Sequence, residues 1–175
     1  MIIENNTINS ILESFKKDLK SDFDVYKNHV YRIYNFALIL DKNKDNHQKY
    51  AIAAAFHDIG IWTHSFDYLA PSIKLASKYL TKINQTAWTD EIALMINNHH
   101  KISTYHGEHA KTVEVFRRAD WVDVVKGIKL FGLNKSDYTL VKKEFTNKGF
   151  HKFLIRETFN YFIKHPLNPL PMFKK

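Results

Sequence analysis

Apolar residues recur every three or four positions along most of the chain. The spacing is regular between residues 7 and 20, and it returns in the segments 21–40, 71–80, 89–99 and 113–124. This spacing predicts amphipathic α-helices, and the alternation of apolar and polar residues that predicts a β-strand does not occur in the sequence. The pattern therefore indicates an all-α fold.

Capping residues give these helices their expected boundaries. Ser21 and Asp24 resemble a capping box in which Asp replaces the usual Glu. Pro71 suits the first position of a helix, and Thr89 suits the N-cap of the next helix. We therefore expect one continuous helix over residues 7–20 and separate helices that begin near these capping residues.

The segment AIAAAFHDIG, residues 51–60, is rich in alanine and ends in a histidine and a carboxylate. Small side chains let neighbouring helices approach closely, so we expect other helices to pack on this one, which runs from about residue 47. Gly60 is expected to end it. Consecutive helical residues point about 100° apart, but at a helix end His57 and Asp58 can both turn toward one ion.

The chain is long enough for one domain with its own core. Two further helices are expected at about 136–165, and the last ten residues are expected to form an extended cap. The expected architecture is a single-domain bundle of about seven or eight helices over residues 1–175. Its motif-bearing part covers about residues 20–127, and the C-terminal helices pack on that part.

Composition agrees with a folded protein in a reducing compartment. Apolar residues make up 45% of the chain, including 13 Phe and 9 Tyr, which excludes disorder. The absence of cysteine excludes disulfides, Cys-based zinc sites and thiol nucleophiles. The N-terminus lacks the basic segment of a signal peptide, and no apolar run is long enough to span a bilayer. A cytoplasmic location without membrane contact is therefore expected.

The formal net charge of +8 raises the question of anionic partners. The basic residues are mostly lysines scattered along amphipathic segments rather than gathered in a long run. This distribution favours a solvated surface, or a surface that attracts a small anionic substrate. A dedicated nucleic-acid surface is the least favoured interpretation.

Four polar residues lie on otherwise apolar helical stripes or at their ends: His29, His57, Asp58 and Asp120. A buried charge is costly unless it is paired or binds a metal. Two imidazoles and two carboxylates suit a divalent transition metal such as Fe, Mn, Zn, Co or Ni. Four protein ligands leave positions on an octahedral ion for water and a substrate oxygen, which favours a catalytic site over a structural one.

The same residues also have ordinary interpretations. His29 alone is typical of a hydrogen-bonded core histidine. The charge of Asp120 alone could be balanced by a basic residue close to it in sequence, such as Arg117, Arg118 or Lys126. The residues by themselves therefore leave a metal site and a set of unrelated polar contacts both open.

The order of the four residues resembles the HD-domain superfamily of metal-dependent phosphohydrolases. The resemblance rests on His29, on the pair His57 and Asp58 within FHDIG, and on Asp120 within RADWVD, and it covers about residues 20–127. It implies an all-helical domain, a bound metal ion and hydrolase activity. It is specific for the superfamily and the metal, and it says little about the substrate.

The sequence departs from the patterns of several HD subfamilies, which narrows the set of subfamilies that it resembles. The sequence lacks the Gly-Tyr-Pro tripeptide of the cyclic-dinucleotide phosphodiesterases and the Glu-Asp pair of the guanosine-tetraphosphate hydrolases. Ile61 stands where the 5′-nucleotidase-like members place a catalytic glutamate. Small stand-alone members, including the cyanamide-hydratase-like group, are more similar in the segments SIKLASKYL and INNHH.

The site is expected to extend beyond the four ligands. The candidate catalytic residues are Asp58, Asp123 and His99, and the candidate substrate-binding residues are His64, Lys74 and His100. Asp123 is expected to orient a ligand histidine or to act as a base, with a salt bridge as the alternative. Ligation of a second metal ion is an alternative role for the histidines at 64, 99 and 100, and an ordinary surface position is the favoured alternative for Lys74.

The sequence thus predicts an enzyme, an HD-type phosphohydrolase that acts on a nucleotide or another small phosphate ester. One metal ion per chain is expected to lower the pKa of a bound water toward neutrality. Two alternatives remain, a metal-dependent hydratase or C–N hydrolase of the cyanamide-hydratase-like type, and a non-catalytic binding module. A homo-oligomer is compatible with the sequence.

Overall fold

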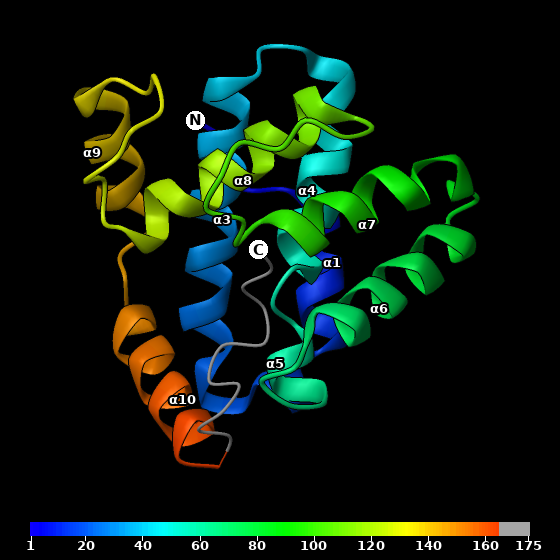
Figure 1. The fold of residues 1–175 in the computed structure, drawn as a ribbon, viewed down its shortest axis with the longest axis vertical. Coiled ribbons are helices and arrows are strands. Elements are labelled where there is room, and N and C mark those ends of the chain that lie inside the picture. The colour runs from blue at the N-terminus through cyan, green and yellow to red at the C-terminus, as the bar shows by residue number, and fades with distance from the viewer. Residues whose placement is uncertain (165–175) are drawn as a thin grey trace.

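Every regular element in residues 1–164, the part of the chain that the computed structural model describes, is a helix (Figure 1). The all-α prediction is therefore confirmed, whereas the extended cap expected at the C-terminus lies outside the described residues. Two of the ten α-helices in this part are single turns of four residues. The helices are α1 (Asn6–Ser14), α2 (Lys16–Leu19), α3 (Phe23–Leu40), α4 (His47–Phe56), α5 (Gly60–Thr63), α6 (Leu69–Lys82), α7 (Thr89–Asn98), α8 (Ala110–Val124), α9 (Lys135–Glu144) and α10 (Phe150–Lys164).

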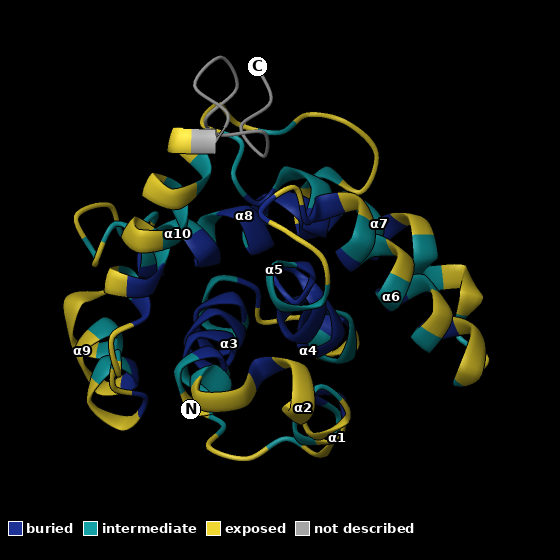
Figure 2. Ribbon diagram, turned by 90° about the horizontal axis from the view of Figure 1, so that it is seen from below, coloured by how far each residue is buried: buried dark blue, intermediate teal, exposed yellow. Residues whose placement is uncertain are grey.

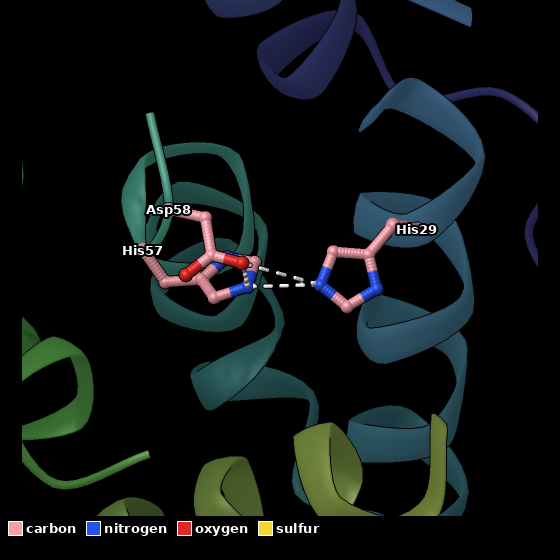
Figure 3. Close-up of side chains that lie close together, drawn as sticks. All are labelled: His29, His57 and Asp58. Atoms are coloured by element: carbon pink, nitrogen blue, oxygen red, sulfur yellow. Dashed lines mark hydrogen bonds and ion pairs between the residues drawn. The ribbon is translucent and has the colours of Figure 1, made fainter. Parts of the chain in front are cut away.

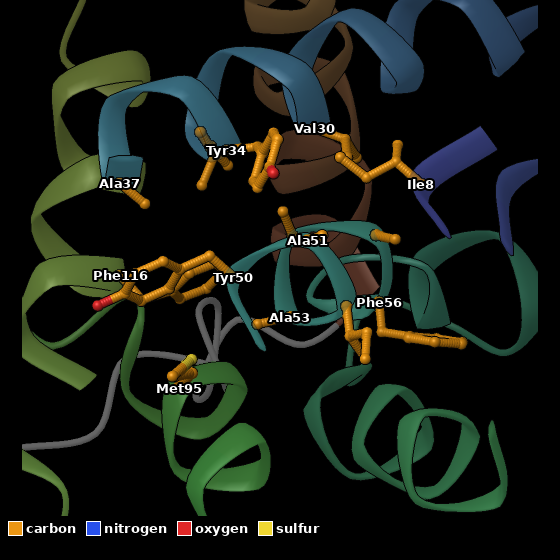
Figure 4. Close-up of a cluster of buried hydrophobic side chains, with 14 of the residues drawn as sticks. Ile8, Val30, Tyr34, Ala37, Tyr50, Ala51, Ala53, Phe56, Met95 and Phe116 are labelled. Carbon is orange, nitrogen blue, oxygen red and sulfur yellow. The ribbon is translucent and has the colours of Figure 1, made fainter. Parts of the chain in front are cut away.

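Helices α3 and α4 form the buried centre of the molecule (Figures 1 and 2). Every residue of α4 from Tyr50 to Phe56 is buried, and α1, α3, α6 and α7 all pack on this helix. Figure 4 shows Ala51 on the side of α4 that faces α3, and Ala53 on the side that faces Met95 of α7. The short alanine side chains let these helices approach closely, as the sequence predicted.

The remaining helices form two groups around this centre. Helices α6 and α7 pack on each other on one side of α4, and α8 lies against both α3 and α7. Helices α9 and α10 run beside α3 on its other side, as expected for the C-terminal segment (Figure 1). Four helices consequently meet inside the bundle: α3 and α8 along their length, and α4 and α7 at their C-terminal ends.

The expected helix over residues 7–20 is interrupted at Phe15, so that prediction is wrong. Phe15 has φ −107° and ψ 12°, and its N–H bonds to the Leu12 carbonyl in a tighter turn than that of an α-helix. The capping box predicted downstream is also not formed. A 3₁₀ turn leads straight into α3 without a side-chain cap, and the Asp24 carboxylate lies 3.1 Å from Lys148 Nζ instead.

Thr89 does not cap α7 as predicted. It is the first residue of the helix, and Trp88 occupies the N-cap position without a side-chain hydrogen bond. A 3₁₀ turn at Thr86–Trp88 again precedes the helix, so the backbone is already helical where a capping residue would have to be extended. Pro71 is the third residue of α6 and not the first, because the helix already begins at Leu69. It still lies in the first turn, where its missing N–H leaves no intrahelical bond unmade.

Gly60 begins α5 and does not end α4 by itself, which corrects the predicted helix stop. Its role is to allow close packing. A Cβ atom at this position would lie 2.5 Å from the carbonyl oxygen of Tyr68 and 2.9 Å from Ser72 Oγ. The Gly60 N–H donates to Ser72 Oγ at 3.0 Å, so the turn that carries the histidine and aspartate is fastened to the start of α6.

A buried ion pair anchors the loop between α7 and α8. Glu114 accepts hydrogen bonds from Arg117 Nε at 2.7 Å, Arg118 Nε at 2.8 Å and the backbone N–H of Tyr105 at 3.1 Å. Arg117 also donates to the Lys101 carbonyl at 2.9 Å. Burial opposes ionisation, but these hydrogen bonds and the arginine charge lower the pKa of Glu114 to about 2. The loop after His100 is thereby tied to α8.

Replacing Glu114 with Gln is expected to lower the free energy of unfolding by about 1–3 kcal/mol near neutral pH, because buried Arg117 loses its charged partner. The folded-state pKa of Glu114 lies below its ordinary value of 4.5, so its stabilising contribution is present above pH 4.5 and is lost as the pH falls through about 2. Denaturant titrations of both proteins along this pH range measure the difference. If the difference in free energy of unfolding between the two proteins stays constant down to pH 2, the stabilising role of the Glu114 charge is contradicted.

Candidate metal centre

Six imidazole and carboxylate side chains from four helical segments meet inside the bundle. They lie on α3, at the end of α4, just after α7 and on α8, and they are His29, His57, Asp58, His99, His100 and Asp120. All except His100 have at most 4% of the side chain exposed, and His100 has 17%. The four predicted ligands are therefore brought together, and both histidines of the 99–100 pair join them.

Three of the histidines direct the same nitrogen inward. In each ring Nδ1 lies within hydrogen-bonding distance of an acceptor oxygen: Asp123 Oδ2 for His29 (2.8 Å), the Ala54 carbonyl for His57 (2.8 Å) and the Ile96 carbonyl for His99 (2.6 Å). A carbonyl or carboxylate oxygen accepts, so each Nδ1 carries the hydrogen. In the neutral imidazole Nε2 then carries a lone pair, which is the arrangement of a metal-ligating histidine.

Hydrogen bonds between neutral rings do not explain how closely the inward nitrogens approach each other, because neither Nε2 atom carries a hydrogen. His29 Nε2 and His57 Nε2 are 3.1 Å apart, and Asp58 Oδ2 lies 3.6 Å from the first and 3.2 Å from the second (Figure 3). A separation near 3 Å is the one that two nitrogens have when each lies about 2.1 Å from one ion at about a right angle. Asp120 Oδ1 completes the group at 3.8 and 3.9 Å from the two nitrogens.

A second group shares the same aspartate. Asp58, His99 and His100 each offer a ligand atom, and these atoms lie within 4.8 Å of one another, as those of His29, His57 and Asp58 do. Asp58 Oδ1 and His99 Nε2 are buried, 3.4 Å apart, and have no hydrogen-bond partner among the described residues. Two buried acceptors that face each other without a donor fit a cation between them.

The two carboxylates of the cluster contact histidines but no lysine or arginine among residues 1–163. No lysine or arginine nitrogen in that range lies within 4.0 Å of the Asp58 or Asp120 oxygens, so none of the basic residues considered from the sequence pairs with Asp120. Burial raises the pKa of Asp120 to about 8; the Asp58 and Asp123 charges raise it too, whereas the His99 charge lowers it. Burial acts against ionisation of Asp58 as well, but the surrounding histidines, His57 foremost, favour its charged form and hold its pKa well below the usual range.

Asp123 is placed as an orienting group rather than as a base. Arg32 donates to it twice, from Nε at 2.6 Å and from Nη2 at 2.7 Å, and His29 Nδ1 donates at 2.8 Å. Despite its burial, the hydrogen bond from His29 and the Arg32 charge hold the pKa of Asp123 below its usual range, which makes it a poor proton acceptor. Of the alternatives stated for Asp123, the geometry favours the orienting role and the salt bridge together.

Sequence reasoning missed Arg32, although a signal was present. Arg32 lies three residues after His29, so its side chain occupies the same face of α3, and it is fully buried. Tyr26 lies one turn before His29, and its hydroxyl donates to the Ala55 carbonyl at 3.1 Å and accepts from the Asp58 N–H at 3.3 Å. Both residues hold the cluster in place without belonging to it.

Helix α10 covers one side of the cluster. The Phe150 ring is fully buried and stacks on the His29 ring with centroids 3.7 Å apart. His151 Nε2 donates to the Asp123 carbonyl at 3.0 Å, and Phe153 stacks on Trp62 at 4.9 Å. The C-terminal helices therefore exclude water from the centre, and His100 is its most exposed member.

Two predicted substrate-binding residues lie apart from this cluster. His64 is exposed after α5, and its Nδ1 lies 2.9 Å from its neighbour Thr63 Oγ1. Lys74 is exposed on α6, and within the described part of the chain no hydrogen bond or ion pair joins it to the cluster. For Lys74 this agrees with the favoured surface interpretation.

Comparison of the chain with protein-family models, with curated proteins and with solved structures found no match to it. None of the helices in residues 1–164 combines the length and the apolar character that crossing a bilayer requires. The case for a function therefore rests on the geometry of the centre.

Replacing Asp123 with Asn is expected to reduce the free energy of unfolding by about 3–5 kcal/mol, because Arg32 then keeps a buried charge without a counterion. It should also weaken binding of a metal ion at the His29 group about 10–100-fold, because that ring loses its charged acceptor. Denaturation and metal titration measure the two effects. The matched control is Asp24→Asn, whose carboxylate belongs to an exposed pair and should matter by less than about 1 kcal/mol. If Asp123→Asn and Asp24→Asn have the same stability and the same metal affinity, the orienting role of Asp123 is contradicted.

Proposed function

We propose that this chain is a metal-dependent hydrolase of the HD-domain type that acts on a small phosphate ester such as a nucleotide. The observation that carries the proposal is the convergence of imidazole nitrogens and carboxylate oxygens in a buried centre where no lysine or arginine among the described residues pairs with the carboxylates. Such a centre is electrostatically unfavourable by itself, and a divalent cation would relieve it. The order of the residues, which resembles the HD superfamily, supports the same conclusion.

Two sets of residues fit the ions. His29, His57 and Asp58, with Asp120 beside them, would hold the first ion, and Asp58, His99 and His100 would hold a second. The sequence predicted one ion per chain, and the sharing of Asp58 between two groups favours a pair. When bound, the metal supplies an activated water and a Lewis acid for the electrophilic centre of the substrate.

The chain's own residues supply positioning. Arg32 and Asp123 fix the ring of His29, and the carbonyl oxygens three residues earlier fix the rings of His57 and His99. The covering by α10 keeps the centre dry, which strengthens every electrostatic interaction inside it. His100, at the exposed edge, is the member placed to meet a substrate or to pass a proton outward.

One observation favours a second candidate, hydrolysis or hydration of a small neutral C–N compound. Phosphate sites ordinarily use arginine or lysine against the ester oxygens. Here the arginine nearest the cluster, Arg32, is committed to Asp123, and Lys142 Nζ lies 3.9 Å from the same carboxylate. Phosphate binding would therefore depend on the metal ions themselves, whereas a neutral substrate needs no further cation.

The first test is elemental analysis of protein purified without added metal or chelator, beside the Asp58→Ala variant. We expect one to two transition-metal ions per chain in the wild type and loss of both in the variant, because Asp58 belongs to both groups. Helicity by circular dichroism should be nearly unchanged. Asp18→Ala, which removes an exposed carboxylate, is the matched control. No ion in the wild type, even after reconstitution with Mn²⁺ or Fe²⁺, would falsify the proposal and favour the binding module.

The substrate class is tested with the metal-loaded protein. A panel of nucleotides and phosphomonoesters should release phosphate, and the rate should fall to background in Asp58→Ala. A panel of nitriles and small amides, monitored by ammonia or amide formation, separates the second candidate. Turnover of only the neutral panel would reject the phosphohydrolase and retain the metal-dependent enzyme.

A further inference from the structure

The hydroxyl of Tyr68 contacts the cluster at the histidine that reaches solvent. Its oxygen lies 2.5 Å from His100 Nε2, and the Tyr68 residue is only 2% exposed. The two rings meet edge to face, with centroids 6.2 Å apart. Carbonyl oxygens of their own helices contact Nδ1 of His57 and His99, whereas the tyrosine hydroxyl contacts the other ring nitrogen, Nε2, of His100.

The backbone of Tyr68 is fastened to the turn that carries the His57–Asp58 pair. The Tyr68 carbonyl accepts from the Ser72 N–H at 2.9 Å, and Ser72 Oγ accepts from the Gly60 N–H at 3.0 Å. A side chain at Gly60 would collide with the Tyr68 carbonyl oxygen. Gly60 therefore lets the start of α6 approach the turn, and this close approach brings the tyrosine hydroxyl to His100.

We propose that Tyr68 is a positioning residue for the second ion, and that Gly60 and Ser72 serve to place it. The inference rests on the proposed function, since it assumes that Asp58, His99 and His100 hold an ion. A hydrogen bond to one nitrogen of a ligand histidine fixes the ring plane and lowers the cost of ordering the ligand. His100 follows the last turn of α7 and is the most exposed member of the cluster, so its ring gains most from such a contact.

The test compares Tyr68→Phe with Tyr79→Phe by calorimetric titration of the chelator-stripped protein with Mn²⁺. Tyr79 lies on the same helix and packs on Phe56, away from the cluster. In Tyr68→Phe we expect the first ion to bind as in the wild type and the second to bind about 10–100-fold more weakly. Tyr79→Phe should match the wild type for both ions.

A readout without metal tests the contact itself. In the ion-free protein, the ¹⁵N chemical shifts of the His100 ring should change in Tyr68→Phe and stay unchanged in Tyr79→Phe, because the shifts report which nitrogen carries the hydrogen. Ser72→Ala removes the acceptor for the Gly60 N–H while leaving the tyrosine in place. It should produce a smaller loss of affinity for the second ion than Tyr68→Phe.

The outcomes separate the inference from the proposed function. A wild-type chain that binds two ions, with unchanged affinity for both in Tyr68→Phe, overturns the role of Tyr68 and leaves the metal-dependent hydrolase intact. A wild-type chain that binds a single ion has the same consequence. A chain that binds no ion overturns the proposed function and the inference together.

Discussion

The structure depends on holding mutually repulsive groups close together in the buried interior of the bundle. His29 and His57 direct nitrogen lone pairs at each other across 3.1 Å, and two carboxylates lie within 4 Å of them. No basic side chain among the described residues offsets these carboxylates directly. The surrounding helices must therefore be packed rigidly enough to keep the groups in place, because a softer core would let the side chains turn away.

The sequence of α4 provides that rigidity. Alanines on several sides of one helix allow close contacts with α1, α3, α6 and α7 at once, and the histidine and aspartate follow at its end. The absence of a side chain at Gly60 continues this close packing into the next turn and brings α6 against it. The short FHDIG segment thus contributes candidate ligands through His57 and Asp58 and contributes packing through its glycine. Both contributions serve the same centre.

Periodicity predicted most of the helices and singled out the four candidate ligands, because both depend on which residues share a face. It placed His29 and Asp120 among apolar neighbours, where a polar residue requires a partner. Periodicity does not predict which side chains pair with these polar residues, because the partners come from distant segments. Asp123 on α8, for example, pairs with Arg32 on α3. It also failed at Gly60 and Phe15, because local helix signals do not report how closely another helix approaches or where a 3₁₀ turn replaces an α turn. Tyr68 gave no signal in the sequence, since its role depends entirely on the place where α6 begins.

The distribution of charge also bears on how the centre would be filled. The chain carries a net charge of +8, yet its buried centre is acidic, and the arginines near it are committed to Asp123 or Glu114. A cation entering the centre meets two carboxylates, one of which has a pKa raised to about 8 and would release its proton to bind the ion. The energy gained by that ion then adds to the stability of the fold, because the unfolded chain does not assemble the ligands. Metal binding and folding would in this way be linked through the same few side chains.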